Sequence, residues 1–192
     1  MARVKLLLSD TGPLFTLALA DALDLLGLLS MPVILTDEVV HEATWNPQSE
    51  AASRVRRWLD GKPPYLEVVA TEIGRMAADL RHAGRNAPTD IGEESVVNAI
   101  KTGSVGEGPY MILFEESRLA DPQFYGPRPV HVVSTRAFLV GLERAGLLPS
   151  GEADALWRAV KTAKRNPNPA IIDIPSEVDG EETSWTPVPG DA

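Results

Sequence analysis

Acidic residues recur just after predicted strands of this sequence. Asp10 closely follows the apolar run 4–8, and Glu115 and Glu116 directly follow the apolar run 109–114. Each run is short, apolar and bounded by turn residues, which is typical of a buried strand. In open α/β sheets, binding sites form outside the carboxyl ends of the strands. A carboxylate at such a position is therefore a candidate site residue, although Asp10 is equally well placed to cap the helix that follows it.

Two further acids lie on predicted helices. Glu42 lies in the helix predicted over 38–43, and Glu93 in the first turn of the helix predicted over 91–102. Three, four and seven residues after Glu93 come the apolar residues Val96, Val97 and Ile100, which share its helical face. A carboxylate on an apolar face is costly to bury without a partner. Glu93 is therefore a second site candidate, whereas Glu94 points elsewhere and is expected to be solvated.

Several carboxylates converging at one sheet edge repel one another unless a cation neutralises them. The 192 residues include no cysteine, and the three histidines fit no metal-ligand spacing. Hard oxygen ligands without thiolates favour Mg²⁺ or Mn²⁺. Such a metal can generate hydroxide near neutral pH and stabilise the leaving oxygen in phosphodiester hydrolysis. The alternative interpretation is that these residues are ordinary surface acids or helix caps.

The elements that would position these acids alternate along the chain. Strands are predicted over 4–8, 31–35, 65–70, 109–114 and 130–133. Helices are predicted in two pieces within 14–29, then over 38–43, 50–59, 71–85, 91–102 and 136–145, with a last one after Ser150. We expect Asp90 or Thr89 to cap the helix that carries Glu93, and Ser150 to cap the last helix. Alternating strands and helices indicate an α/β fold with a central parallel sheet.

Composition and charge bound the function. The formal net charge is −9, but residues 173–192 carry six acidic residues and no Lys or Arg. Most of the negative charge therefore lies in this segment, and a local basic groove on the body is not excluded. Because no apolar run is long enough for a signal peptide or a membrane span, we expect a cytoplasmic protein with no membrane partner. We expect three parts: residues 1–150 as the main domain, 151–174 as a helix and short apolar segment, and 175–192 as an acidic tail.

The chain resembles the PIN-domain ribonucleases, especially the toxins of bacterial toxin–antitoxin modules. The resemblance lies in the order and spacing of several short motifs between about residues 4 and 148. These are Leu8-Ser9-Asp10-Thr11-Gly12-Pro13-Leu14, Val39-Val40-His41-Glu42, Asp90-Ile91-Gly92-Glu93, Ile112-Leu113-Phe114-Glu115-Glu116-Ser117-Arg118, and Val133-Ser134-Thr135 with Gly146-Leu147-Leu148.

The resemblance implies a three-layer α/β/α fold and a metal-dependent endoribonuclease. It implies that Asp10, Glu42, Glu93 and an acid after the fourth strand bind Mg²⁺ or Mn²⁺ and activate water. The family usually has Asp, often an Asp-Asp pair, where this chain has Glu115 and Glu116. Glu116 matches the family position better, but either glutamate remains a candidate ligand. A catalytically inactive PIN-like or Rossmann-like binding protein is the alternative that this departure favours.

The same resemblance suggests supporting residues and partners. Thr135 or Ser134 matches a hydroxyl that often supports the site, and a protein antitoxin is an expected partner. RNA contact is predicted for basic residues on flanking helices, with solvated helix faces as the alternative interpretation: Arg54, Arg57, Arg81 and Lys101. The leucine-rich segment 14–29 carries more apolar surface than a small sheet needs, so we also expect a homodimer.

Overall fold

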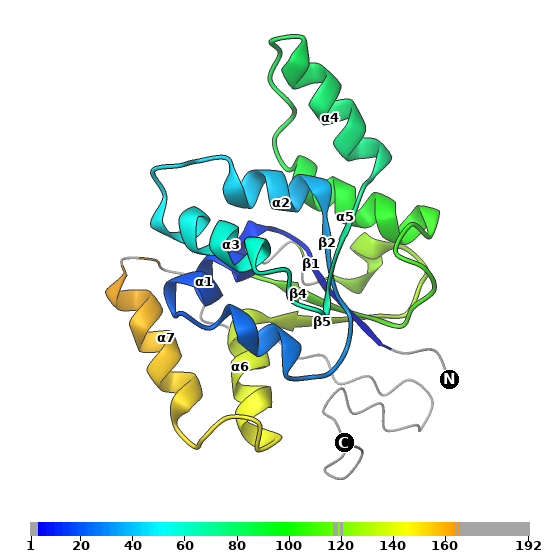
Figure 1. The fold of residues 1–192 in the computed structure, drawn as a ribbon. Helices are drawn as coiled ribbons and strands as arrows, with labels where there is room; N and C mark the ends of the chain where they lie inside the picture. The colour runs from blue at the N-terminus through cyan, green and yellow to red at the C-terminus, as the bar shows by residue number, and fades with distance from the viewer. Residues whose placement is uncertain (1–3, 117–118, 120, 164, 166–192) are drawn as a thin grey trace.

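Five short strands form the centre of the molecule. The computed structural model describes residues 4–116, 119, 121–163 and 165. The strands form a parallel sheet in the order β3-β2-β1-β4-β5. Their bounds are β1 Lys5–Leu8, β2 Val33–Thr36, β3 Leu66–Val69, β4 Tyr110–Phe114 and β5 Val130–Ser134. Helices flank the sheet, with α5 on one side and α6 on the other (Figure 1). The predicted α/β class with a parallel central sheet is confirmed.

Each predicted helix has a counterpart in the structure. The α-helices are α1 Thr11–Leu19, α2 Asp37–Thr44, α3 Glu50–Asp60, α4 Glu72–His82, α5 Ile91–Thr102, α6 Thr135–Arg144 and α7 Glu152–Thr162. Among the described residues, the 3₁₀ helices η1 Leu23–Gly27 and η3 Pro122–Tyr125 lie between them. The sequence interpretation did not predict η3, because its residues follow neither the helical nor the strand period. Helix α4 contacts α5 and α2 and extends away from the sheet (Figure 1).

The central strands explain why their sequences are continuously apolar. The described apolar residues of β1, Leu6–Leu8, and all five residues of β4 are buried. A parallel strand covered by helices on both faces reads as an apolar run rather than as an alternating pattern. In the register of these two strands Leu8 lies opposite Leu113. The chain therefore leaves β1 and β4 at the same edge of the sheet, which brings the acids that follow them together.

The leucine-rich segment forms two helical pieces, as predicted, and buries most of its apolar surface within the same chain. Leu23, Leu26 and Leu29 belong to the core, whereas Leu28 is 37% exposed. These leucines are therefore explained largely by the core of one molecule. The homodimer stays a prediction that this segment no longer motivates.

Two capping predictions need correction. Asp90 occupies the N-cap position of α5, but it has a φ of 67° and its side chain makes no capping hydrogen bond. Ser150 does not cap α7, whose N-cap residue is Gly151. The Glu143 carboxylate of α6 instead accepts hydrogen bonds from the backbone N–H groups of Gly151 and Ala153, at 2.8 and 3.0 Å. A carboxylate from a neighbouring helix satisfies first-turn N–H groups as well as a local side chain does.

The C-terminal part of the chain is described only as far as Arg165. Helix α7 contacts α6 and α1, and its Trp157 belongs to the same core as the strands. The apolar segment around Ile171 and the acidic tail 175–192 lie outside the described residues. In the part of the chain that the structure describes, no helix combines the length and apolar character that a membrane crossing needs.

Candidate metal centre

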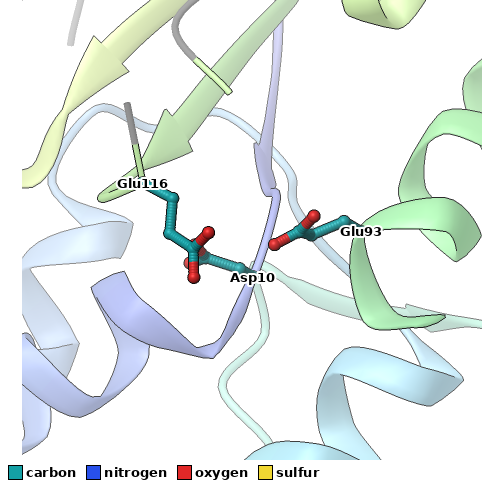
Figure 2. Close-up of side chains that lie close together, drawn as sticks. All are labelled: Asp10, Glu93 and Glu116. Atoms are coloured by element: carbon teal, nitrogen blue, oxygen red, sulfur yellow. The ribbon is translucent and has the colours of Figure 1, made fainter. Parts of the chain in front are cut away.

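Three carboxylates meet at the carboxyl edge of the sheet. Asp10, Glu93 and Glu116 each offer an oxygen that lies within 4.8 Å of the other two (Figure 2). We call these residues the three-carboxylate group. Asp10 and Glu93 are buried, with 7% and 6% of their surface exposed, whereas Glu116 is exposed. The group is therefore held by buried side chains but opens to solvent at Glu116.

Three separate elements position the group. Asp10 follows β1, Glu116 follows β4, and Glu93 lies in the first turn of α5. Because β1 and β4 are neighbours in the sheet, their acids emerge side by side, and Glu93 reaches them from the other side (Figure 2). Glu93 is buried and Glu94 is exposed, as the apolar face of α5 predicts.

Asp10 caps a helix and belongs to the three-carboxylate group at the same time. Its Oδ1 accepts a hydrogen bond of 2.8 Å from the Gly12 N–H at the start of α1. The pKa of Asp10 is raised to about 7, first by burial and then by the charges of Glu115, Glu93 and Glu116, against the lowering effect of the Gly12 hydrogen bond. The capping interpretation of Asp10 is therefore confirmed, and its role as a site residue stays a prediction that its place in the three-carboxylate group supports. The hydrogen bond from Gly12 holds the Asp10 side chain in place, while the neighbouring carboxylates disfavour its negative charge.

Glu115 and Glu116, the two candidate ligands after β4, have different environments. Glu115 is 8% exposed, and its Oε2 accepts a hydrogen bond of 2.6 Å from Nη2 of Arg165. Its other oxygen, Oε1, is buried without a hydrogen-bond partner among the described residues. Glu116, and not Glu115, lies in the three-carboxylate group. The geometry thus favours Glu116 as the ligand and assigns Glu115 to an ion pair.

Glu42 lies outside the three-carboxylate group. Its Oε1 accepts a hydrogen bond of 3.1 Å from the backbone N–H of Gly92, in the first turn of α5. A Cβ atom at Gly92 would lie 2.5 Å from Glu42 Oε2, so this glycine allows the carboxylate to approach the helix. Burial raises the pKa of Glu42 above its ordinary value, partly offset by the Gly92 hydrogen bond. Glu42 therefore caps α5 in place of the Asp90 side chain. It does so at Gly92, the residue before Glu93.

The predicted supporting hydroxyls lie at the end of β5. Ser134 is the N-cap of α6, and its hydroxyl accepts a hydrogen bond from the Ala137 N–H. Thr135 is 1% exposed, and its Oγ1 has no hydrogen-bond partner among the described residues. The described contacts therefore give Ser134 a capping role and leave the role of Thr135 a prediction.

Two of the predicted RNA contacts are engaged within the chain. Arg54 donates to the Ala18 carbonyl at 3.0 Å and pairs with Glu50 at 2.7 Å, and Arg81 pairs with the buried carboxylate of Glu38. Arg57 lines a small cavity of about 170 Å³ together with Arg54, Trp58 and acidic neighbours from the α1–η1 connection. Lys101 is exposed at the end of α5. Arg57 and Lys101 thus remain the more accessible of the four.

Arg165 and Tyr125 are site neighbours that the sequence interpretation missed. Arg165 follows the last helix and lies fifty positions from its partner Glu115. Tyr125 lies on η3 and donates its hydroxyl to the Leu119 carbonyl at 3.1 Å. Burial raises the pKa of Tyr125 well above its usual range, and the negative charges of Asp10 and Glu93 act in the same direction. Neither residue carries a local motif, so periodicity and spacing gave no signal for it.

The donor set of the three-carboxylate group fits a hard divalent cation. All three side chains offer oxygen, and their separation of up to 4.8 Å is close to the span of a coordination sphere. Mg²⁺ binds oxygen at about 2.1 Å, so oxygens on opposite sides of the ion lie about 4.2 Å apart. Small movements of the side chains would bring them to that span. The three-carboxylate group could therefore hold a cation of this class.

Comparisons with known proteins add no relative. No family model matches the chain, and neither a curated protein nor a solved structure matches it. Fold and site together define an α/β protein with a carboxylate group, suited to a divalent cation, at the carboxyl edge of a parallel sheet.

Proposed function

We propose that this chain is a Mg²⁺- or Mn²⁺-dependent endoribonuclease with a PIN-like fold. The observation that carries the proposal is the convergence of Asp10, Glu93 and Glu116, which lie far apart in the sequence, to within 4.8 Å. The order and spacing of the motifs around these residues support the same class. Within it, we propose the toxin of a toxin–antitoxin pair, with RNA as substrate, a protein antitoxin as partner and a homodimer as the assembly.

The proposed chemistry assigns a role to each described side chain. Asp10, Glu93 and Glu116 would hold the cation, and a cation there would activate water near neutral pH and stabilise charge on the leaving oxygen of a phosphodiester. Glu42 holds the first turn of α5 through Gly92 and so positions Glu93. Glu116, as the exposed member, places the centre where a phosphate backbone reaches it. Exposed cations such as Lys101 and Arg57 are the proposed contacts for that backbone.

The decisive experiment compares two adjacent glutamates. Glu93→Gln removes a buried member of the three-carboxylate group, whereas Glu94→Gln changes an exposed neighbour on the same helix. We expect the full chain to cleave single-stranded RNA with Mn²⁺ or Mg²⁺ and to stop in EDTA. Glu93→Gln should lose cleavage and Glu94→Gln should retain it. Cleavage that survives both EDTA and Glu93→Gln would reject the proposal.

The alternative function is a catalytically inactive PIN-like or Rossmann-like binding protein, with RNA as its test ligand. The observation that favours it is the Glu115-Glu116 pair in place of the shorter aspartates of the family pattern. This alternative predicts Mn²⁺ and RNA binding by the unaltered chain with no cleavage at any divalent-metal concentration. Gel-shift and cleavage assays on the same RNA separate the two functions.

A further inference from the structure

Arg165 joins two elements that carry the proposed metal centre. Its Nη2 donates to Glu115 Oε2 at 2.6 Å and to the Gly12 carbonyl at 3.0 Å, and its Nε donates to Thr16 Oγ1 at 2.9 Å. The guanidinium also lies 5.8 Å from the ring centroid of Phe15. One side chain therefore links the end of β4 to the first turns of α1. Arginine suits this place because its planar fork serves several acceptors at once.

The contacts of Arg165 extend to Asp10 through a single residue. Gly12 accepts from Arg165 with its carbonyl and donates to Asp10 with its N–H. A Cβ atom at Gly12 would lie 3.0 Å from Asp10 Oδ1, Glu115 Cβ and Glu115 Oε2. Asp10 and Glu115 are thus packed against the same glycine. We expect a shift of the Glu115 carboxylate to displace Gly12 and, through it, the Asp10 side chain.

Among the described residues, Arg165 is the one hydrogen-bond partner that the structure gives to the Glu115 carboxylate. Glu115 Oε1 is buried without a hydrogen-bond partner in the described part of the chain, and Oε2 bonds to Arg165. Glu115 is also adjacent to Glu116, a member of the three-carboxylate group. Without Arg165, Glu115 would be a buried carboxylate with no compensating charge among the described residues, next to a group that could hold a cation. Its most favourable new partner would be the cation itself.

We infer that Arg165 is a positioning residue that decides which of two consecutive glutamates binds the cation. It holds Glu115 in an ion pair against α1 and leaves Glu116 to complete the centre with Asp10 and Glu93. The inference rests on the proposed metal-dependent function. If Arg165 has this role, the centre at the sheet edge depends on a residue that follows α7.

The test is a double-mutant cycle between Arg165 and Glu115 in the full chain. Arg165→Met should lower the unfolding temperature of the metal-free protein by about 5 °C, because it leaves a buried carboxylate without its partner. It should also change the electron paramagnetic resonance spectrum of bound Mn²⁺ and lower kcat for RNA cleavage about tenfold or more. Adding Glu115→Gln to Arg165→Met should restore the spectrum and most of kcat. Arg158→Met, at an exposed position on α7, is the matched control and should change none of these.

A second variant disturbs the packing of Asp10 and Glu115 without removing a charge. Gly12→Ala places a methyl group against both Asp10 and Glu115. We expect it to change the Mn²⁺ spectrum in the same direction as Arg165→Met. The inference is overturned if Arg165→Met leaves the Mn²⁺ spectrum unchanged, or if Glu115→Gln fails to restore it. Since the spectrum and the unfolding temperature need no RNA, these outcomes are separate from a failure of the unaltered chain to cleave RNA.

Discussion

Two groups of acids lie in the part of the chain that the structure describes, and their environments differ. The three-carboxylate group consists of Asp10, Glu93 and Glu116. The α2 group consists of Glu38, which pairs with Arg81, and Glu42, which accepts from the Gly92 N–H. In the α2 group each carboxylate faces a donor from the same chain. In the three-carboxylate group the carboxylates also lie close to one another. Burial raises the pKa of Asp10, and the nearby charges of Glu115, Glu93 and Glu116 raise it in the same direction.

The difference separates acids that stabilise the fold from acids that suit a ligand. A buried carboxylate next to an arginine or a helix N-terminus contributes to stability through its partner. Carboxylates held within 4.8 Å of one another repel when they are ionised, and a bound cation would offset that repulsion. We expect this repulsion to lower the stability of the metal-free chain. The proposed function, which needs a bound cation, would account for that cost.

The largest expected effect comes from Asp10→Asn. This change keeps the shape and the Gly12 hydrogen bond but removes one charge and one ligand. Loss of a metal-positioned hydroxide costs several kcal/mol of transition-state stabilisation, so cleavage should fall by about a thousandfold or more. A single-turnover RNA cleavage assay with Mn²⁺ measures it. An Asp10→Asn chain that cleaves like the unaltered chain would show that the three-carboxylate group is not the active site.

Asp10→Asn, which should lower activity, should raise the stability of the metal-free chain near neutral pH. The pKa of Asp10 is about 7 in the folded chain and 3.8 when unperturbed, so between these values the folded state holds a proton that the unfolded state has lost. In EDTA, stability should therefore fall by a few kcal/mol as the pH rises from about 4 to about 7, and remain low above that range. Asp10→Asn should remove this part of the pH dependence. Urea unfolding at pH 5 and pH 8 measures it.

An intermediate effect is expected from Arg81→Met in the α2 group. The Glu38 side chain is 3% exposed and that of Arg81 is 28% exposed, so the change leaves a buried carboxylate without its arginine. We expect a loss of about 2 kcal/mol in unfolding free energy, reduced from the full cost of a buried pair because Arg81 is partly solvated. Mn²⁺ affinity should not change, and Arg75→Met, exposed on the same helix, is the control. Lost RNA binding with unchanged stability would instead support the RNA-contacting role predicted from the sequence.

The smallest expected effect distinguishes two roles of Glu42. Gln at this position still accepts from the Gly92 N–H, so Glu42→Gln should change stability by less than about 0.5 kcal/mol, whereas Glu42→Ala should cost about 1 kcal/mol through the lost cap. Isothermal titration with Mn²⁺ provides the second measurement. If Glu42→Gln weakens Mn²⁺ binding as much as Glu93→Gln does, Glu42 is a ligand and the division into two groups is wrong.

Local patterns in the sequence determined the elements and most of the centre. The apolar runs 4–8 and 109–114 predicted β1 and β4, because a parallel strand buried on both faces has no polar positions. The helical period around Glu93 separated a buried acid from the exposed Glu94, since neighbours on a helix face different sides. The acids that follow β1 and β4 could be proposed together because the carboxyl ends of parallel strands share one edge of the sheet, whereas Glu93 came from its helical face and Glu116 was preferred over Glu115 only through the family resemblance.

Only the tertiary structure decided which acids are compensated and by what. Arg165 meets Glu115, and Gly92 meets Glu42, across fifty positions of sequence in each case. Arg81 reaches Glu38 across forty-three positions. An ion pair or a long-range cap leaves no periodic trace in the chain, because it needs only two side chains brought to one point by packing. Glu115 and Glu116 differ by one position in sequence, yet Glu116 lies in the three-carboxylate group and Glu115 pairs with Arg165, which follows α7.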